Sequence, residues 1–234
     1  MAGAERARQR IDMHVHTRHS FDCLTDPVRL VEQLDACGLD RICVTDHNEI
    51  DTALALKQRY PERVIVGEEV KTAERVDVIG LFITRRIPRG TPARETCTRI
   101  HDQGGLVYVP HPFAAGKGGG GRILDAIGAD VDVLEGFNAR LHDPALNERA
   151  VAWGRARDVP LGAGSDAHTL AELGRAWVNM PACDDDPAAF LAALRVGTIH
   201  GRASSRVVHL ASTWAKLHKR IVPGARRGLA GEQA

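Results

Sequence analysis

The sequence has no apolar run long enough to cross a membrane. None of its apolar stretches approaches the ~18 consecutive residues that a spanning helix needs. Its N-terminus, "MAGAERARQRIDMH", is basic but has no apolar segment behind the charges, as a secretory signal would have. These absences predict a protein without a membrane partner.

The sequence also has no CxxC pair. Its cysteines form an odd and dispersed set: Cys23, Cys37, Cys43, Cys97 and Cys183. Such a set predicts free thiols in a reducing compartment, where a buried cysteine packs as a small hydrophobe. We therefore expect a cytoplasmic protein.

Acidic residues are missing from Pro187 to Gly231. That segment carries eight cations, namely Arg195, Arg202, Arg206, Lys216, Lys219, Arg220, Arg226 and Arg227. A basic tail on an acidic body favours anion contact or attraction of nucleic acid, and a solvated helix face is the alternative.

Short apolar runs alternate with helical patterns along most of the chain. The predicted strands are 11–16, 41–46, 64–70, 76–84, 106–110, 131–137 and 159–163, and the predicted helices are 26–38, 91–102, 144–157, 187–195 and 213–220, with an extended piece at 198–210. This alternation predicts an α/β fold with a parallel sheet, and seven such units fit a barrel better than an open sheet. We expect one domain over residues 1–210, then a basic helix and a flexible tail over 211–234.

The stretch "IDMHVHTRHSFD" holds three histidines and two aspartates within residues 11–22. On a strand, residues two apart share a face, so His14 and His16 can face one point. Asp22 follows a short turn and can return to the same place. Imidazole is the commonest metal ligand in proteins, although an HxH pair alone is a weak signal.

Further predicted strands also end in polar or charged residues. These ends hold Asp46 to Glu49, then Glu68 and Glu69, then His111, then Glu135, Asn138 and Arg140, and finally Asp166 and His168. Each end alone has a structural explanation, such as a helix cap or a salt bridge. Together they are typical of a barrel enzyme, because the C-terminal ends of parallel barrel strands meet at one mouth. Imidazoles and carboxylates gathered there need cations to neutralise them, and nitrogen and oxygen ligands without thiolate suit Zn, Mn or Fe(II).

The ordered set HxH, SFD, TDH, GxE, HP and SDAH, from about Ile11 to His168, resembles the polymerase and histidinol phosphatase (PHP) superfamily. The resemblance implies a distorted (β/α)7 barrel with a metal cluster at the C-terminal strand ends, which hydrolyses phosphate esters with two or three divalent ions. The segments "LGRAWV" and "VVHLASTWAKLHK" resemble the PHP-associated C-terminal region, which we place from about residue 165.

The resemblance also implies a ligand set. His14, His16 and Asp166 would hold one metal, Glu69 would bridge it to a second metal that His111 binds, and Asp22, His47 and His168 would bind the third. Glu69 is preferred to Glu68 because the family pattern is Gly-x-Glu. Some members have a histidine where this chain has Glu135, so ligation by Glu135 stays open. Asp22 replaces a histidine of some members, which favours Mn or Fe over Zn there.

The implied metals would turn a water into the attacking hydroxide near neutral pH. The leaving oxygen would take its proton from His168, from His19 or from a metal-bound water. Phosphate recognition needs further cations, for which the candidates are Arg18, Lys71, Lys117, Arg122, Arg140 and Arg202, with Asn138 supporting the substrate; for each cation, solvated surface is the alternative. Lys117 and Arg122 flank a glycine tract that lacks the GKS/T ending of a Walker loop.

Three functions are compatible with these patterns. The first is a metal-dependent phosphoesterase that acts on a small phosphorylated metabolite or nucleotide. The second is a 5′–3′ exonuclease or oligoribonuclease on short RNA or DNA, which the basic tail would guide. The third is a non-catalytic metal-binding interaction module, which the completeness of the ligand set disfavours. The oligomeric state is left open.

Overall fold

The structure is a computed structural model that describes residues 7–115 and 118–222. Within these ranges the strands form one sheet in the order β7-β6-β5-β4-β3-β2-β1-β8-β9. Their bounds are β1 Arg8–Val15, β2 Arg41–Val44, β3 Val64–Lys71, β4 Asp77–Leu81, β5 Leu106–Val109, β6 Val133–Asn138, β7 Leu161–Gly164, β8 Ala176–Pro181 and β9 Thr198–Gly201.

Strands β1 to β7 form the predicted barrel, which is nearly closed. A parallel bridge joins Val15, at the end of β1, to Ala167, just after β7. The backbone N–H of His16 donates to the carbonyl of Ala167 at 3.0 Å, and that of Asp166 donates to the carbonyl of His14 at 2.8 Å. These bonds bring the two ends of the seven-strand segment together.

The prediction of an all-parallel barrel is wrong for β4. β4 runs antiparallel to both β3 and β5, because a tight turn, in which Thr72 N–H donates to the Val76 carbonyl at 2.9 Å, replaces a crossover helix between β3 and β4. The reversal places the first residue of β4, Asp77, at the same mouth as the last residues of its neighbours. A charged residue therefore enters the mouth from the start of a strand.

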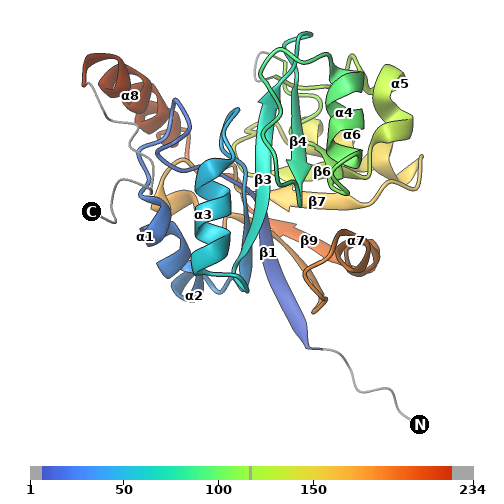
Figure 1. Ribbon diagram of the computed structural model, residues 1–234, viewed down its shortest axis with the longest axis horizontal. Coiled ribbons are helices and arrows are strands. Elements are labelled where there is room, and N and C mark those ends of the chain that lie inside the picture. The colour runs from blue at the N-terminus through green and yellow to red at the C-terminus, as the bar shows by residue number, and fades with distance from the viewer. Residues whose placement is uncertain (1–6, 116–117, 223–234) are drawn as a thin grey trace.

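Helices cover the outside of the barrel (Figure 1). Their bounds are α1 Pro27–Glu32, α2 Leu34–Cys37, α3 Asp51–Arg59, α4 Ala93–His101, α5 Leu124–Ile127, α6 Pro144–Arg155, α7 Pro187–Arg195 and α8 Val208–Ile221, with short 3-10 helices at Gly128–Asp130 and Leu170–Glu172. Asp26 caps α1 through the N–H groups of Val28 and Arg29, as predicted, and Gly38 ends α2 with a φ of 67°. The predicted single helix 26–38 is interrupted at Gln33.

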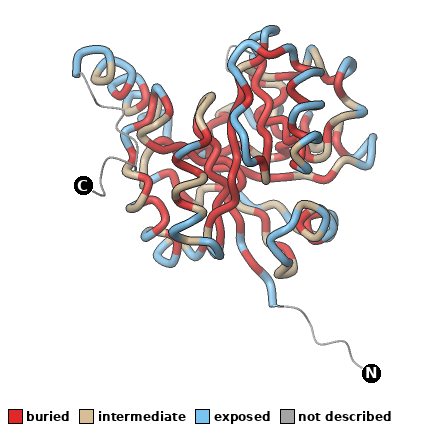
Figure 2. Tube along the Cα trace, in the orientation of Figure 1, coloured by how far each residue is buried: buried red, intermediate tan, exposed pale blue. Residues whose placement is uncertain are grey.

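The hydrophobic core has two layers. Figure 2 shows its buried residues in red through the middle of the molecule. One layer fills the barrel with residues such as Met13, Ile65 and Tyr108. The other layer, which includes Leu56 and Ile100, packs the sheet against the helices. Polar and charged side chains gather at the mouth of the barrel, where the close-packed core beneath them holds them in fixed positions.

The C-terminal part differs from the prediction. The extended piece is shorter than expected, since β9 ends at Gly201 and α8 begins at Val208 instead of Thr213. β8 was not predicted, and it pairs antiparallel with β1 and β9. None of the helices in the described ranges is long and apolar enough to cross a membrane.

Candidate metal centre

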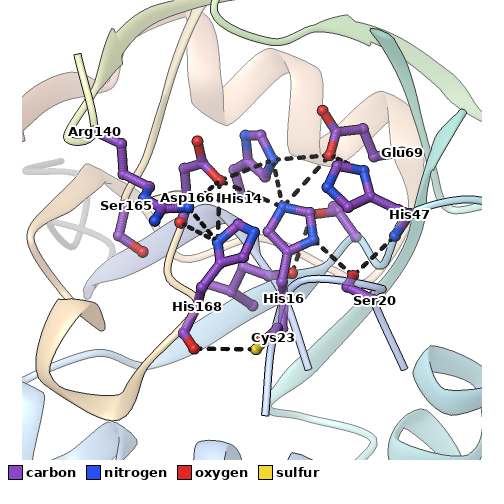
Figure 3. A network of polar contacts seen from close by, with 12 residues as sticks. His14, His16, Ser20, Cys23, His47, Glu69, Arg140, Ser165, Asp166 and His168 are labelled. Atoms are coloured by element: carbon purple, nitrogen blue, oxygen red, sulfur yellow. Dashed lines mark hydrogen bonds and ion pairs between the residues drawn. The ribbon is translucent and has the colours of Figure 1, made fainter. Parts of the chain in front are cut away.

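The predicted ligands meet at the mouth of the barrel. Figure 3 shows part of this group: His14, His16, His47, Glu69, Asp166 and His168. Three groups of side chains have ligand atoms within 4.8 Å of one another. They are His14, His16 and Asp166; His14, Glu69 and His111; and His16, His47 and His168. We call these seven residues, together with Asp22, the metal cluster. All of them are buried except His47, which is partly exposed.

A bulge in β1 aims two histidines at one point. The register of β1 against β2 shifts between Asp12 and Val15. Met13 therefore packs inside the barrel while the next residue, His14, also faces inward, against Gly164. The Nε2 atoms of His14 and His16 lie 3.0 Å apart. The two rings converge as their spacing predicts, although a bulge rather than simple alternation orients His14.

Glu69 lies at the centre of the metal cluster. Its Oε2 atom is 2.9 Å from His47 Nδ1, 3.4 Å from His16 Nε2 and 3.5 Å from His14 Nε2. Its Oε1 atom is 3.2 Å from His111 Nε2. One carboxylate thus joins two of the three groups, which is the position that a bridging ligand occupies.

The neighbouring Glu68 points the other way. Its Oε2 accepts a hydrogen bond of 2.8 Å from the backbone N–H of Ile87, away from the metal cluster. Alternation along β3 explains the difference between these adjacent carboxylates. Burial raises the pKa of Glu68 to about 7.

Asp22 lies at the other end of the metal cluster. Its Oδ1 is 3.2 Å from His168 Nε2 and 3.6 Å from His47 Nε2. Burial alone would raise the pKa of Asp22, but the adjacent imidazole of His168 and the nearby imidazoles of His47 and His16 hold that pKa below its usual range. The loop after β1 therefore returns Asp22 to the mouth, as predicted.

Burial and charge act in opposite directions on the imidazoles. Desolvation alone would lower the pKa of His14, but the carboxylates of Glu135 and Glu69 raise it well above its ordinary value. Burial and the neighbouring His168 lower the pKa of His16 to about 4. Adjacent buried imidazoles repel one another when both are protonated. Protonation of the histidines alone therefore neutralises the negative charge of the carboxylates poorly.

Several buried atoms of the metal cluster lack hydrogen bonds. Within the described ranges, Asp22 Oδ1, Glu69 Oε2 and His168 Nε2 are each buried without a hydrogen-bond partner. An unsatisfied buried polar atom is costly. Carboxylate oxygens and imidazole nitrogens such as these are ligand atoms that divalent metals bind. The residues present therefore fit a centre that binds metal through nitrogen and oxygen.

Two cluster residues have strained backbones. Asp166 and His111 adopt φ values of 54° and 30°, in the left-handed region that residues with a side chain seldom enter. Such strain gathers at functional sites, where the surrounding fold enforces it. Gly164 has a related role, because a Cβ there would lie 2.3 Å from His14 Cβ and 2.5 Å from Glu135 Oε1.

Glu135 lies behind His14 and outside the three groups of facing ligand atoms. Its Oε1 accepts from Tyr108 at 3.0 Å and lies 3.1 Å from His14 Nδ1. Its Oε2 accepts from the backbone N–H of His111 at 2.6 Å and from Asn138 Nδ2 at 2.9 Å. Both oxygens are thus occupied, and the carboxylate is placed to orient the ring of His14.

A second supporting network went unpredicted. The carboxylate of Asp46 accepts bonds from the backbone and hydroxyl of Thr17, and from those of Ser20. The Ser20 hydroxyl oxygen also lies 3.0 Å from His16 Nδ1 and accepts from the N–H of His47 at 3.0 Å. Asp46 therefore fixes the first ligand loop. The "TDH" motif marks its strand end, but nothing in the sequence marks its partners.

The rim of the mouth carries cations. Arg140 Nη1 is 2.8 Å from His168 Nδ1, Arg140 Nε is 3.1 Å from Glu172, and Arg140 Nη2 donates to Ser212 of α8 at 2.7 Å. Lys216, also on α8, has its Nζ 3.7 Å from Asp22 Oδ2. The C-terminal helix that the sequence predicts as a separate basic segment, α8, therefore reaches the metal cluster. Asn138 donates weakly toward Asp166, at 3.4 Å.

The other predicted substrate and proton-transfer residues lie farther out. Arg18 Nη1 pairs with Asp26 at 2.6 Å, and His19, whose pKa burial lowers, is not among the residues that line the mouth. Arg202 is exposed just after β9 and does not line the mouth either. Arg122 lines a separate groove. Lys117 lies outside the described residues.

Comparison with known proteins places the chain in a family. The family model described as PHP domain matches residues 12–148, more than half of the chain. The chain belongs to the PHP family. A further model, described as PHP-associated, matches residues 144–199 of this PHP protein. As a member of the family, it is a metal-dependent hydrolase.

Individual proteins are similar to this chain in sequence or in fold. The PHP protein is 31% identical over 202 residues to the uncharacterized protein MJ0417 of Methanocaldococcus jannaschii, covering 81% of this chain and 80% of that one. Its fold is similar to PsfC from Pseudomonas syringae, with a TM-score of 0.67, 22% identity and coverage of 90% and 98%. It is also similar to a two-domain protein from Bacteroides vulgatus that contains a predicted PHP-like metal-dependent phosphoesterase, with a TM-score of 0.65, 18% identity and coverage of 91% and 71%. These structural likenesses bear on the fold alone.

Proposed function

We propose that this PHP protein hydrolyses a phosphate ester of a small metabolite or nucleotide with two or three divalent ions of Mn, Fe or Zn. The observation that carries the proposal is the metal cluster, in which buried imidazoles and carboxylates converge and several of their nitrogen and oxygen atoms have no hydrogen-bond partner. In the proposed assignment, His14, His16, Asp166, Glu69, His111, Asp22, His47 and His168 hold the ions. Bound ions would supply charge to stabilise a phosphoryl group and would lower the pKa of water.

The chain's own residues then bind and orient the substrate. Arg140, Lys216 and Lys71 line the mouth and bring positive charge to phosphoryl oxygens. Glu135 and Asp46 orient the histidine rings and the first ligand loop. Of the two predicted proton donors, His168 lines the mouth and His19 does not. An imidazole that holds an ion cannot also give a proton from the same nitrogen, so for His168 the two roles are alternatives.

The direct test is hydrolysis of a panel of phosphate compounds by protein loaded with Mn, Fe(II) or Zn. The panel contains a mononucleotide, a sugar phosphate, a cyclic phosphate, a dinucleotide and a chromogenic phosphodiester. We expect metal-dependent turnover that is lost in His14→Ala. Bound metal without turnover of any compound would reject the proposal and favour a non-catalytic binding module.

A further inference from the structure

A second hollow lies beside the mouth and is lined by cations. It has a volume of about 800 Å³, and no aspartate or glutamate is among its lining residues. Its charged residues are Lys71, Arg75, Arg89, Arg122 and Arg149. We call it the arginine groove. A concave surface of one charge sign focuses the electrostatic potential and attracts ions of the opposite sign.

The arginine groove is assembled from distant parts of the chain. Lys71 ends β3, Arg75 belongs to the turn before β4, and Arg89 precedes α4. Arg122 follows the glycine tract, and Arg149 lies on α6. Four segments of the chain, the β3–β4 turn among them, converge here with the same charge, so the groove is not one solvated helix face.

The four arginines of the groove have no carboxylate partner in the described part of the chain. The side chains of Arg75 and Arg89 make neither a hydrogen bond nor an ion pair there, while Arg122 donates to the backbone carbonyl of Glu74. Arg149 lies over the ring of Phe113, 4.2 Å from its centre.

Several arginines elsewhere in the described part of the chain pair with carboxylates instead. Arg41 pairs with Asp185, Arg63 with Asp35 at 2.6 Å, and Arg195 with Asp158 at 3.2 Å. The groove therefore keeps its guanidinium groups available to an external anion. Guanidinium forks fit phosphate oxygens in bidentate pairs.

The groove and the mouth share a residue. Lys71 lines both, and its Nζ lies 2.6 Å from Asp77. The two linings are also joined by a hydrogen bond, since the N–H of Asp77, which lines the mouth, donates at 2.8 Å to the carbonyl of Gly118, which lines the groove. Gly118 has a φ of 82°, and a Cβ there would collide with the Asp77 carboxylate. A molecule bound at the mouth can thus extend past Lys71 into the groove.

We propose that the arginine groove binds a second phosphate group of the substrate, on the same molecule as the ester at the metal cluster. The proposal rests on the proposed function and narrows it to substrates with at least two phosphates. Two sources share this chemistry: a small bisphosphate and the next phosphate of a short oligonucleotide.

The test compares matched substrates and matched variants. The substrates are a nucleoside monophosphate, the corresponding 3′,5′-bisphosphate and a 5′-phosphorylated tetranucleotide, each with the metal-loaded protein. The variants are Arg75→Gln/Arg89→Gln and Arg149→Gln. The control is Arg157→Gln, because Arg157 also lies over an aromatic ring, that of Trp153, at 4.4 Å, but does not line the groove.

We expect the wild type to have a higher kcat/KM for the substrates with a second phosphate than for the monophosphate. In the double variant the ratio of these kcat/KM values should fall about tenfold, because charge-assisted contacts to the second phosphate are removed. Activity on the monophosphate and all activities of Arg157→Gln should stay close to wild type. A preference for the bisphosphate over the tetranucleotide identifies a metabolite, and the reverse identifies a nucleic acid. An unchanged preference in the double variant would overturn the proposal.

A binding measurement separates this proposal from the proposed function. Calorimetry with a hydrolysis-resistant bis(phosphorothioate) should show about tenfold weaker binding to the double variant than to wild type or Arg157→Gln. If no substrate is hydrolysed but this difference is found, the proposed function fails and the groove stands. If substrates are hydrolysed and binding is equal in all variants, the groove assignment fails alone.

Discussion

The metal cluster and the arginine groove lie side by side but are built in opposite ways. The metal cluster is buried, mixes imidazoles with carboxylates, and sits on strand ends that the core holds in place. The arginine groove is open, carries a single sign of charge and is formed by turns and helix surfaces. The difference indicates two functions. The metal cluster is rigid and contains both signs of charge, which suits catalysis. The arginine groove has positive charge without carboxylates in its lining, which suits recognition of an anion.

The largest expected effect is confined to the metal cluster. Asp166→Asn removes the negative charge of a predicted metal ligand that lies 3.4 Å from His16 Nε2. The asparagine side chain can still accept the hydrogen bond from Asn138. We expect activity to fall by at least about 100-fold, because even the partners of ligands cost 10- to 100-fold when they are changed. Steady-state kinetics with saturating metal checks this. A loss no larger than that of the groove variant would erase the contrast between the two regions.

A smaller effect is expected one layer behind the ligands. Glu135→Gln weakens the contact to His14 Nδ1 and should reduce metal affinity about 10- to 100-fold. Competition with a metal chelator measures that affinity. Glu68→Gln is the matched control, since this buried carboxyl faces away from the metal cluster and should leave metal affinity unchanged. Equal losses in both variants would show that loss of a buried carboxyl group, and not orientation of His14, lowers the metal affinity.

The packing of the metal cluster can be tested through stability. Gly164→Ala inserts a methyl group against His14 and Glu135, and overpacking of this kind costs about 1–3 kcal/mol. Urea unfolding measures the loss. Gly128→Ala is the control, because its Cβ would meet only Trp153 at an ordinary 3.5 Å. If the two alanine variants were equally stable, the mouth would be looser than described.

The smallest effect is expected for the cysteine thiols. Their reactivity in the wild-type protein measures how deeply each cysteine is buried. Burial raises the pKa values of Cys23 and Cys97 to about 12, so at pH 8 these groups remain protonated and unreactive. Cys43 is fully buried as well, whereas Cys37 and Cys183 are partly exposed. A disulfide reagent should therefore react quickly with the last two thiols only, and with all five after unfolding. Fast reaction of Cys23, which lies beneath the ligand loop, would contradict a rigid mouth.

The strand-end motifs made much of the metal cluster predictable. Each predicted ligand follows or ends an apolar strand, and a barrel brings such ends together whatever lies between them. The Gly-x-Glu pattern selected Glu69 over Glu68, and the structure separates these two residues by strand alternation. Helix signals such as Asp26 and Gly38 also marked their boundaries correctly.

The rest depended on contacts that no local pattern encodes. The reversal of β4 follows from a turn that replaces a helix, and the bulge in β1 follows from pairing with β2. Residues far apart in the sequence create the Asp46–Ser20 network, the contact of α8 with the mouth, and the arginine groove. Arg75, Arg89 and Arg149 look like ordinary surface residues until the fold gathers them.

We expect the metal cluster to bind the divalent ions that hydrolysis requires. The most direct test is to strip the protein with a chelator, reload it with Mn, Fe(II) or Zn, and measure bound metal and phosphate release on the same samples. We predict two or three ions per chain, with turnover that rises and falls with their number, and loss of both in Asp166→Asn. Equal turnover in stripped and reloaded protein would contradict the account.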